Sequence, residues 1–395
     1  MIRYFTGGES HGKGLIAIIE GLPADLFIDP SIINSCLSKR QTGYGRGNRM
    51  SIEKDHVDIL SGVRGGYTIG SPVTLYVENK DWQNWEDVMD PIHKNTSRRV
   101  VTMPRPGHAD LSGGIKYDHH DLRNVLERSS ARETAVRTAV GAVAKLLLSN
   151  ISIELYSYVV SLGTVRIKPD VLPMITLGNS YLRKLSRIAA SDAYQMNMPD
   201  TAASKRAMKI IEDTKKRGNT LGGVFEVRAV NVPVGLGSYS QWDRKLDGRL
   251  AGALMSIQAI KGVEIGDGVA NAGRYGSEVH DEIFYSAKKG FYRKTNRAGG
   301  IEGGVTNGEE IILRAYMKPI STLYSPLHSV DVVRKSPARA AIERSDVCAV
   351  AAASVVGEAV TAIELANAVM EKFGGDTIND LKNNYNYYIS RIKKY

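Results

Sequence analysis

Glycines that separate short apolar runs constrain the fold of this chain more than any other feature of its sequence. The 395 residues include 39 glycines, and many are paired, as at Gly65 with Gly66 and at Gly303 with Gly304. Apolar runs such as 73–77 and 311–315 lie between such clusters. Glycine permits positive φ and close backbone approach. The pattern therefore predicts many strands joined by tight turns that face a ligand.

Three segments have the spacing of amphipathic helices. Ser130 and Glu133 have the SxxE spacing of a capping box, so a helix is expected to begin near Ser130 and continue through apolar residues to position 147. A leucine stripe predicts a second helix over 243–260. A third, rich in small residues, is expected to follow Asp346 as its N-cap. No linker or repeat divides the sequence, which predicts a single domain over 1–395.

The composition is that of a folded soluble protein. The formal charge is +10, because 52 Lys and Arg exceed 42 Asp and Glu, and 43% of residues are hydrophobic. The first residues contain no apolar signal segment, and no apolar run is long enough for a membrane span. Cys36 and Cys348 are too few for a disulfide framework. We therefore expect a cytoplasmic protein with reduced thiols and no membrane partner.

The N-terminal segment GGESHGKG, residues 7–14, matches only part of a phosphate-binding P-loop. Gly14 replaces the Ser or Thr that would hold magnesium, and residues 15–20 are typical of a strand where the motif requires a helix. A nucleoside triphosphatase is therefore disfavoured. His11 remains, displayed on a glycine-flanked turn beside Ser10. It is either a functional histidine or a turn histidine held by hydrogen bonds.

Two further segments combine cations or a histidine with glycine. RQTGYGRGNR places Arg40, Arg46 and Arg49 among glycines, which suits either an anion site or a solvated basic loop; its similarity to a dinucleotide fingerprint is weak. RPGHAD presents His108 after two prolines, at 104 and 106, and a bend at Gly107, either for catalysis or as a simple turn cap. No Cys, His and carboxylate spacing completes a metal site, so we predict no metal.

The segment RSSARE places Arg128 and Arg132 beside a helix N-terminus, where free N–H groups and the helix dipole favour an anion. Arg344, next to Asp346, and Lys318, before a proline turn, are further candidate cations. The two histidines and at least six arginines outnumber the carboxylates visible near them in the sequence. Cations without such partners would repel one another in one cleft. A ligand with several negative charges is therefore expected.

The strings GESHG, RPGHAD, RSSARETA and ERSD, with RQTGYGRGNR and GGVTNG, resemble the chorismate synthase family from residue 2 to the C-terminus. The resemblance implies an anti 1,4-elimination that converts 5-enolpyruvylshikimate 3-phosphate to chorismate and phosphate, in aromatic amino acid biosynthesis. Reduced FMN is then required without net redox change. The implied fold is of the α+β class: a β-α-β sandwich, in which antiparallel sheets enclose a central helical layer, assembled as a homotetramer.

The resemblance also implies roles for individual residues. Our mechanistic hypothesis on that basis is that His11 acts as the acid or hydrogen-bond donor to the leaving phosphate, that His108 stabilises the anionic N1 region of reduced flavin, and that Asp346 and Ser10 relay the C6 proton. The residues implied to line the flavin are Ser129, Ser130, Ala131, Gln258, Ala259, Gly303, Lys318, Pro319, Ile320, Ser321, Thr322 and Arg344. Those implied to grip the substrate are Arg40, Arg46, Arg49 and Arg132, of which Arg40 and Arg46 are also associated with NADP.

Two positions depart from the family pattern: Gln258 stands where relatives often have Asn, and Ser321 where many have Pro. The chain lacks the long insertions of relatives that reduce their own flavin, so a separate flavin reductase is expected. Two alternatives remain. A nucleic-acid-binding protein is disfavoured because aromatic residues are only 7% and scarcely interleave with the basic run. A flavin reductase would consume NADPH in step with turnover.

Overall fold

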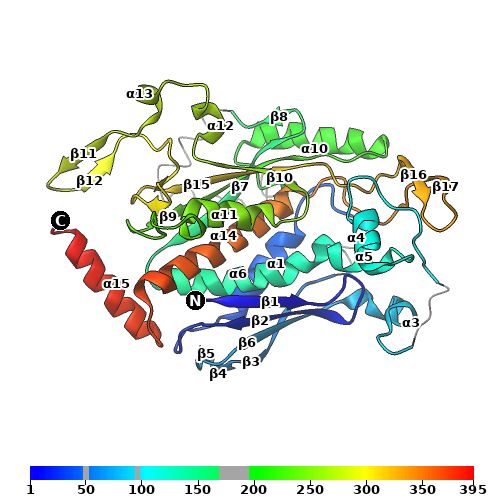
Figure 1. Ribbon diagram of the computed structural model, residues 1–395, viewed down its shortest axis with the longest axis horizontal. Coiled ribbons are helices and arrows are strands. Elements are labelled where there is room, and N and C mark those ends of the chain that lie inside the picture. Colours follow the sequence, from blue (N-terminus) through cyan, green and yellow to red (C-terminus); the bar gives the residue numbers. More distant parts are fainter. Residues whose placement is uncertain (48–52, 94–97, 169–194) are drawn as a thin grey trace.

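Two antiparallel sheets enclose a layer of helices in the computed structural model of the protein (Figure 1). The structure describes residues 1–47, 53–93, 98–168 and 195–395. The four-stranded sheet has the order β1 (Arg3–Gly7), β2 (Gly14–Glu20), β6 (Val73–Glu78), β3 (Val57–Ser61). The five-stranded sheet has the order β10 (Ile260–Ile265), β15 (Ile311–Met317), β9 (Gly223–Val230), β7 (Glu154–Leu162), β8 (Val165–Arg166). The expected β-α-β sandwich is confirmed.

The central layer contains α6 (Thr134–Ser149) and α14 (Val350–Phe373), with α1 (Pro30–Gln41) and α11 (Leu246–Met255) packed beside them. Helix α6 contacts β2 and β6 of one sheet, and α14 contacts β7 and β9 of the other. Small residues let these two helices approach closely. A Cβ atom on Gly141 of α6 would lie 2.3 Å from the Cβ atom of Ala359 in α14. By length and composition α14 could cross a bilayer, but 89% of its most apolar window is buried inside this molecule.

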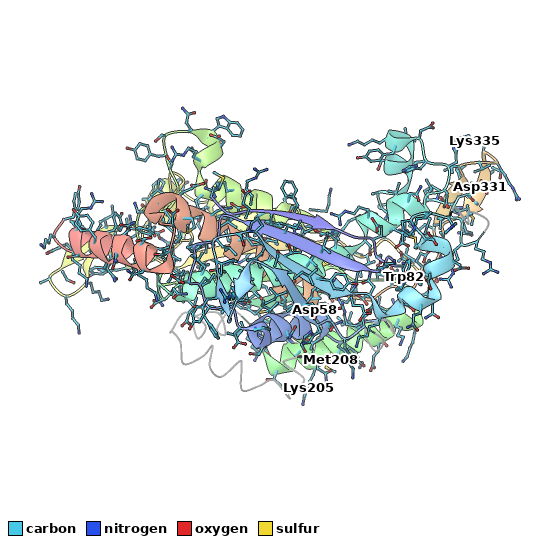
Figure 2. The ribbon with its side chains drawn as sticks, turned by 90° about the horizontal axis from the view of Figure 1, so that it is seen from below. Asp58, Trp82, Lys205, Met208, Asp331 and Lys335 are labelled. Atoms are coloured by element: carbon cyan, nitrogen blue, oxygen red, sulfur yellow. The ribbon has the colours of Figure 1, made fainter. Side chains whose placement is uncertain are left out.

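Shorter elements surround the sandwich. The helices are α3 (Glu86–Met89), α4 (Asp110–Tyr117), α5 (Arg123–Ser129), α10 (Thr201–Lys216), α12 (Gly268–Asn271), α13 (Gly276–Val279) and α15 (Ile378–Ile392). The two-stranded hairpins are β4 (Val63–Arg64) with β5 (Tyr67–Thr68), β11 (Ile283–Ser286) with β12 (Gly290–Arg293), β13 (Ile301–Glu302) with β14 (Val305–Thr306), and β16 (His328–Asp331) with β17 (Ser336–Arg339). Figure 2 places Trp82 at the same end of the molecule as Asp331 and Lys335 of the last hairpin.

The strands predicted at 15–20, 73–77 and 311–315 are confirmed as β2, β6 and β15. The predicted capping box at Ser130 is wrong. Ser130 instead accepts a hydrogen bond from the Arg132 N–H at 3.3 Å, within a 3-10 helix over Ala131–Glu133 that precedes α6. Glu133 accepts a hydrogen bond from the Thr6 hydroxyl of β1 at 3.0 Å. The Glu133 side chain, which the sequence motif assigned to the helix cap, therefore makes a tertiary contact with β1 instead.

The sequence predicted Asp346 as the N-cap of helix α14, and this prediction is wrong. Helix α14 begins only at Val350, and its N-cap position is occupied by Ala349. The Asp346 carboxylate instead accepts a hydrogen bond from the Gly47 N–H at 2.7 Å and lies 3.1 Å from the Arg46 guanidinium. This pairing joins the segment that contains Arg46 and Gly47 to the segment that precedes α14.

Candidate active site

A single cavity of about 930 Å³ collects most of the residues singled out from the sequence. Cavities of several hundred Å³ typically hold small molecules and cofactors. The predicted residues that line it are Ser10, His11, Arg40, Arg46, His108, Ser129, Ser130, Ala131, Arg132, Gln258, Ala259, Lys318, Ile320, Ser321, Thr322, Arg344 and Asp346. They come from segments more than 300 residues apart, so the fold itself brings them together.

Three predicted residues are not placed on the cavity wall. Pro319 is absent from the lining although both of its neighbours belong to it. Gly303 lies in the exposed turn between β13 and β14, outside the cavity. Arg49 lies outside the described residues.

His11 occupies the turn between β1 and β2 and is held by a buried carboxylate. Its Nδ1 lies 2.9 and 3.0 Å from the two oxygens of Glu127, and its main-chain N–H donates to the same carboxylate at 2.8 Å. The imidazole stacks on Trp85 with ring centres 3.8 Å apart. Burial raises the pKa of Glu127, but the hydrogen bonds and charge of His11 outweigh it and hold that pKa below its ordinary value. Glu127 is therefore an ionised acceptor.

His108 is likewise held at its Nδ1 by a buried carboxylate. Its Nδ1 lies 2.5 Å from an oxygen of Asp110, which is fully buried at the first residue of α4. Arg105 donates its Nε–H to the other oxygen of Asp110 at 2.8 Å. Burial raises the pKa of Asp110, but hydrogen bonds from His108 and Arg105 outweigh it and hold that pKa well below its ordinary value. Gly107, with φ of 78°, makes the bend before His108.

The arginines of the site do have carboxylate partners, which corrects the expectation drawn from the sequence. Arg132 lies 2.6 Å from Asp55 and donates to the Asn79 side chain at 2.9 Å. Arg40 lies 3.5 Å from the other oxygen of Asp55 and donates to the Thr134 hydroxyl at 2.9 Å. Burial lowers the pKa of Arg40 to about 9, against the opposing effect of Asp55. These groups form a buried network of ion pairs and hydrogen bonds beneath one wall of the cavity.

The more accessible cations are Arg344 and Lys318. Arg344 is exposed and lies 3.7 Å from Asp81. Lys318 donates a hydrogen bond to the Gly107 carbonyl, which also accepts one from the Ser321 hydroxyl at 2.9 Å. Ser321 thus helps to tie the His108 loop to the segment after β15. Within the described part of the chain, no cluster of three or more His, Cys, Asp or Glu side chains is arranged for a metal ion.

The cavity fits a planar, partly polar cofactor such as flavin. The side-chain oxygens Oγ of Ser129 and Oε1 of Gln258 are buried and have no hydrogen-bond partner among the described residues, although both residues line the cavity. Such groups are costly to bury without a partner. Ala259 holds a left-handed backbone, with φ of 68°, which is unusual for a residue with a side chain and concentrates at functional sites. Ala352 and Val356 of α14 add an apolar wall.

Sequence reasoning missed several residues that shape the site. Asp110 and Arg105 lie within RPGHAD, so the carboxylate partner of His108 was available two residues away. Glu127 precedes the RSSARE segment by one residue, but nothing in the sequence links it to His11, 116 positions earlier. Trp85 lies outside every motif. Only the fold identifies Glu127 and Trp85 as residues that shape the site.

Comparisons with known proteins identify the family of the chain. The family model described as chorismate synthase matches residues 2–370. A protein of Desulforamulus reducens named chorismate synthase is 57% identical, with 100% of both chains covered. A protein of Geotalea uraniireducens with the same name is 56% identical, also with 100% of both covered. A solved structure titled as a crystal structure of chorismate synthase is 43% identical with a TM-score of 0.77, covering 100% of this chain and 99% of that one. The chain therefore belongs to the chorismate synthase family, which converts 5-enolpyruvylshikimate 3-phosphate to chorismate in the shikimate pathway.

Proposed function

We propose that the cavity binds 5-enolpyruvylshikimate 3-phosphate and reduced FMN together and acts as a carbon–oxygen lyase on the phosphate ester. The reaction removes phosphate from C3 and a hydrogen from C6 by anti 1,4-elimination. The observation that carries the proposal is the convergence of His11 and His108 in one cavity with Lys318 and Arg344. General acids and cations at one site suit the departure of an anionic leaving group.

The flavin site would be formed by the segments that contain Ser129, Gln258 and Lys318. The buried oxygens of Ser129 and Gln258 could accept or share hydrogen bonds with polar edges of the ring system. Reduced FMN would supply electron density to the breaking C–O bond and take up the C6 hydrogen, without net oxidation. His108, whose Nδ1 is held by Asp110 and whose Nε2 lies 3.3 Å from the Arg105 guanidinium, would stabilise the anionic flavin edge together with that arginine.

The substrate has two carboxylates and a phosphate, so it needs several cations. Arg344 and Lys318 are the accessible candidates, and Arg46 faces the cavity while paired to Asp346. Each charge-assisted hydrogen bond contributes about 1.5 to 3 kcal/mol. Arg132 and Arg40 line the same wall, but most of their donors are already engaged by protein groups, so they would act mainly by position and charge. The exception is Nη1 of Arg40, which is buried without a hydrogen-bond partner among the described residues and lies 3.5 Å from Asp55. We propose NADP as a second ligand of the segment around Arg40 and Arg46.

His11 would donate a proton or hydrogen bond to the departing phosphate. Because Nδ1 faces Glu127, the donor toward the substrate would be Nε2. Positioned general-acid catalysis contributes on the order of 10² to 10⁴ in rate. Ser10 and Asp346 would relay the C6 proton; both line the cavity, and Asp346 is kept in place by Gly47 and Arg46.

We further propose a cytoplasmic homotetramer of single-domain chains, supplied with reduced FMN by a separate reductase. The buried core joins residues from Ile2 to Leu381 in one cluster, which supports a single domain. Phe5, Ile16 and Ile18 expose apolar side chains on the outer face of β1 and β2, which supports self-association. Analytical ultracentrifugation tests the assembly: a monomer at micromolar concentration would contradict it.

The catalytic proposal is tested with His11→Ala and His108→Ala in anaerobic turnover with chemically reduced FMN. We expect each variant to lose at least about 100-fold in kcat. His56→Ala is the matched control, because His56 is exposed beside Asp58 and does not line the cavity. Turnover of both site variants within about two-fold of the parent would show that the assigned roles are wrong.

A further inference from the structure

We propose that Glu127 and Trp85 are positioning residues that fix the ring plane of His11 and keep its proton on Nδ1, so that Nε2 faces the substrate. This inference rests on the proposed function of His11, but the contacts that support it are all made between residues of the protein itself. Neither residue falls in a motif that the sequence reasoning assigned to the reaction.

Glu127 holds both the ring and the backbone of the histidine turn. Its carboxylate receives the His11 Nδ1 at 2.9 Å and the His11 main-chain N–H at 2.8 Å, while its own carbonyl receives the Ser10 N–H at 3.0 Å. The Glu127 side chain is buried and ionised, so it can only accept. An acceptor at Nδ1 requires a proton there. In the neutral ring, Nε2 is then an acceptor toward the cavity. In the protonated ring, Nε2 is a donor toward the cavity.

Trp85 controls the ring plane. The indole lies 3.8 Å from the His11 ring centre at an interplanar angle of 21°, so a tilt of the imidazole would collide with it or lose the stack. The indole is itself anchored, since its Nε1–H donates to Asp81 at 3.2 Å and the Arg99 guanidinium lies 3.9 Å from its ring centre. Arg99 holds a left-handed backbone, with φ of 56°, to reach this place.

A second set of charges supports Glu127. Arg123 lies 3.5 Å from the Glu127 carboxylate and 2.8 Å from Glu343, and its guanidinium lies 5.2 Å from the Trp85 ring centre. Among the described residues, the charged groups around His11 and its supports include Glu127, Asp81, Glu343, Arg123, Arg99 and Arg344. Hydrogen-bonded carboxylates of this kind select the tautomer of a catalytic histidine, and their loss can affect rate far more than binding.

The test uses Glu127→Gln, which keeps the shape but offers only one acceptor oxygen to two donors. Nitrogen-15 NMR of the ligand-free, histidine-labelled protein reports which ring nitrogen of His11 carries the proton, and steady-state kinetics separates kcat from KM. We expect the Nδ1–H form of His11 to lose its dominance, with kcat reduced about 10- to 100-fold and KM changed less than about three-fold. Glu127→Asp, which keeps the charge, should recover part of both signals.

Trp85→Phe and Trp85→Leu test the stack separately. Phe retains an aromatic face, so the upfield ring-current shift of the His11 protons should largely remain, whereas Leu should abolish it and lower kcat at least about ten-fold. Asp58→Asn is the matched control for a lost carboxylate beside a histidine, because the exposed Asp58 of β3 lies 4.0 Å from His56. It should change neither readout.

Retention of the Nδ1–H form and of kcat within two-fold in Glu127→Gln overturns the role of Glu127, and an unchanged ring-current shift in Trp85→Leu overturns that of Trp85. If Glu127→Gln does not fold, Glu127→Asp and the Trp85 pair supply the same readouts. Failure of the proposed function is recognised differently: His11→Ala would keep full turnover, while the NMR measurement of the unliganded protein would still judge the positioning.

Discussion

Gly141 is the position where one added methyl group should disturb the core most directly. It lies in α6 against Ala359 of α14, and a Cβ atom there would meet the Ala359 Cβ at 2.3 Å, its Cα at 2.5 Å and its carbonyl oxygen at 2.7 Å. Ordinary carbon contacts are about 3.5 Å or longer, so the helices must separate locally by about 1 Å. Two of the three contacts are backbone atoms, which cannot rotate away.

The magnitude follows from two opposing terms. Overpacking a core costs about 1 to 3 kcal/mol, and backbone contacts place this site near the upper end. Replacing glycine by alanine in a helix contributes about 1 kcal/mol in the opposite direction. We therefore expect Gly141→Ala to lower the free energy of unfolding by about 2 kcal/mol.

Urea unfolding monitored by tryptophan fluorescence, at fixed protein concentration, measures this difference. Gly252→Ala is the matched control, because Gly252 lies in the interior of α11 and a Cβ atom there meets nothing within 4 Å. That substitution should raise the free energy of unfolding by about 0.5 to 1 kcal/mol. Since α14 also lines the cavity, Gly141→Ala should weaken FMN binding and Gly252→Ala should not.

Opposite signs for the two alanine variants are the essential result. If Gly141→Ala is as stable as the parent, or gains as much as Gly252→Ala, the close approach of α6 and α14 does not limit the packing of the core. The reasoning from helix spacing would then be refuted.

Three further outcomes are expected. Asp110→Asn leaves Arg105 buried without its carboxylate and should cost about 3 to 5 kcal/mol in urea unfolding, together with turnover; a loss below 1 kcal/mol would contradict the ion pair. Because the pKa values of Asp110 and Glu127 lie below their ordinary values in the folded protein, their contribution to stability is present above the ordinary carboxyl pKa of about 4 and is lost as the pH falls through the lower folded-state values, so the melting temperature should fall steadily as the pH is lowered below about 4; a flat profile would argue against it. Lys318→Met should weaken FMN binding about ten-fold in fluorescence titration, and unchanged affinity would remove Lys318 from the flavin site.

Local patterns in the sequence were enough to predict the strands β2, β6 and β15 and the approximate places of α6, α11 and α14, whereas the sandwich itself was implied by the family resemblance. In β2 the inward residues Leu15, Ala17 and Ile19 alternate with outward ones, so the strand period was visible without tertiary information. The motifs around His11 and His108 alone left a functional and a structural role open for each histidine, and their shared site was predicted from the excess of cations and from the family resemblance. The cavity confirms that these two segments meet.

Partnerships between distant segments could not be predicted in the same way. The arginines looked short of carboxylates because charges were compared along the chain, whereas Arg132 finds Asp55 from a segment 77 residues away. Glu133 had the spacing of a cap residue, but β1 offers its carboxylate a hydroxyl from Thr6. Trp85 sits in no motif, and only packing places it against His11. Long-range contacts compete with local preferences, and sequence spacing does not report which prevails.

The most direct test of the whole scheme is anaerobic turnover of 5-enolpyruvylshikimate 3-phosphate by the purified protein, with phosphate and chorismate measured together. With chemically reduced FMN we expect the two products in equal amounts and no accumulation of oxidised flavin, and without reduced FMN we expect neither. Equal rates of phosphate release with and without reduced FMN would contradict the claim that cofactor and substrate act together in the cavity of His11 and His108.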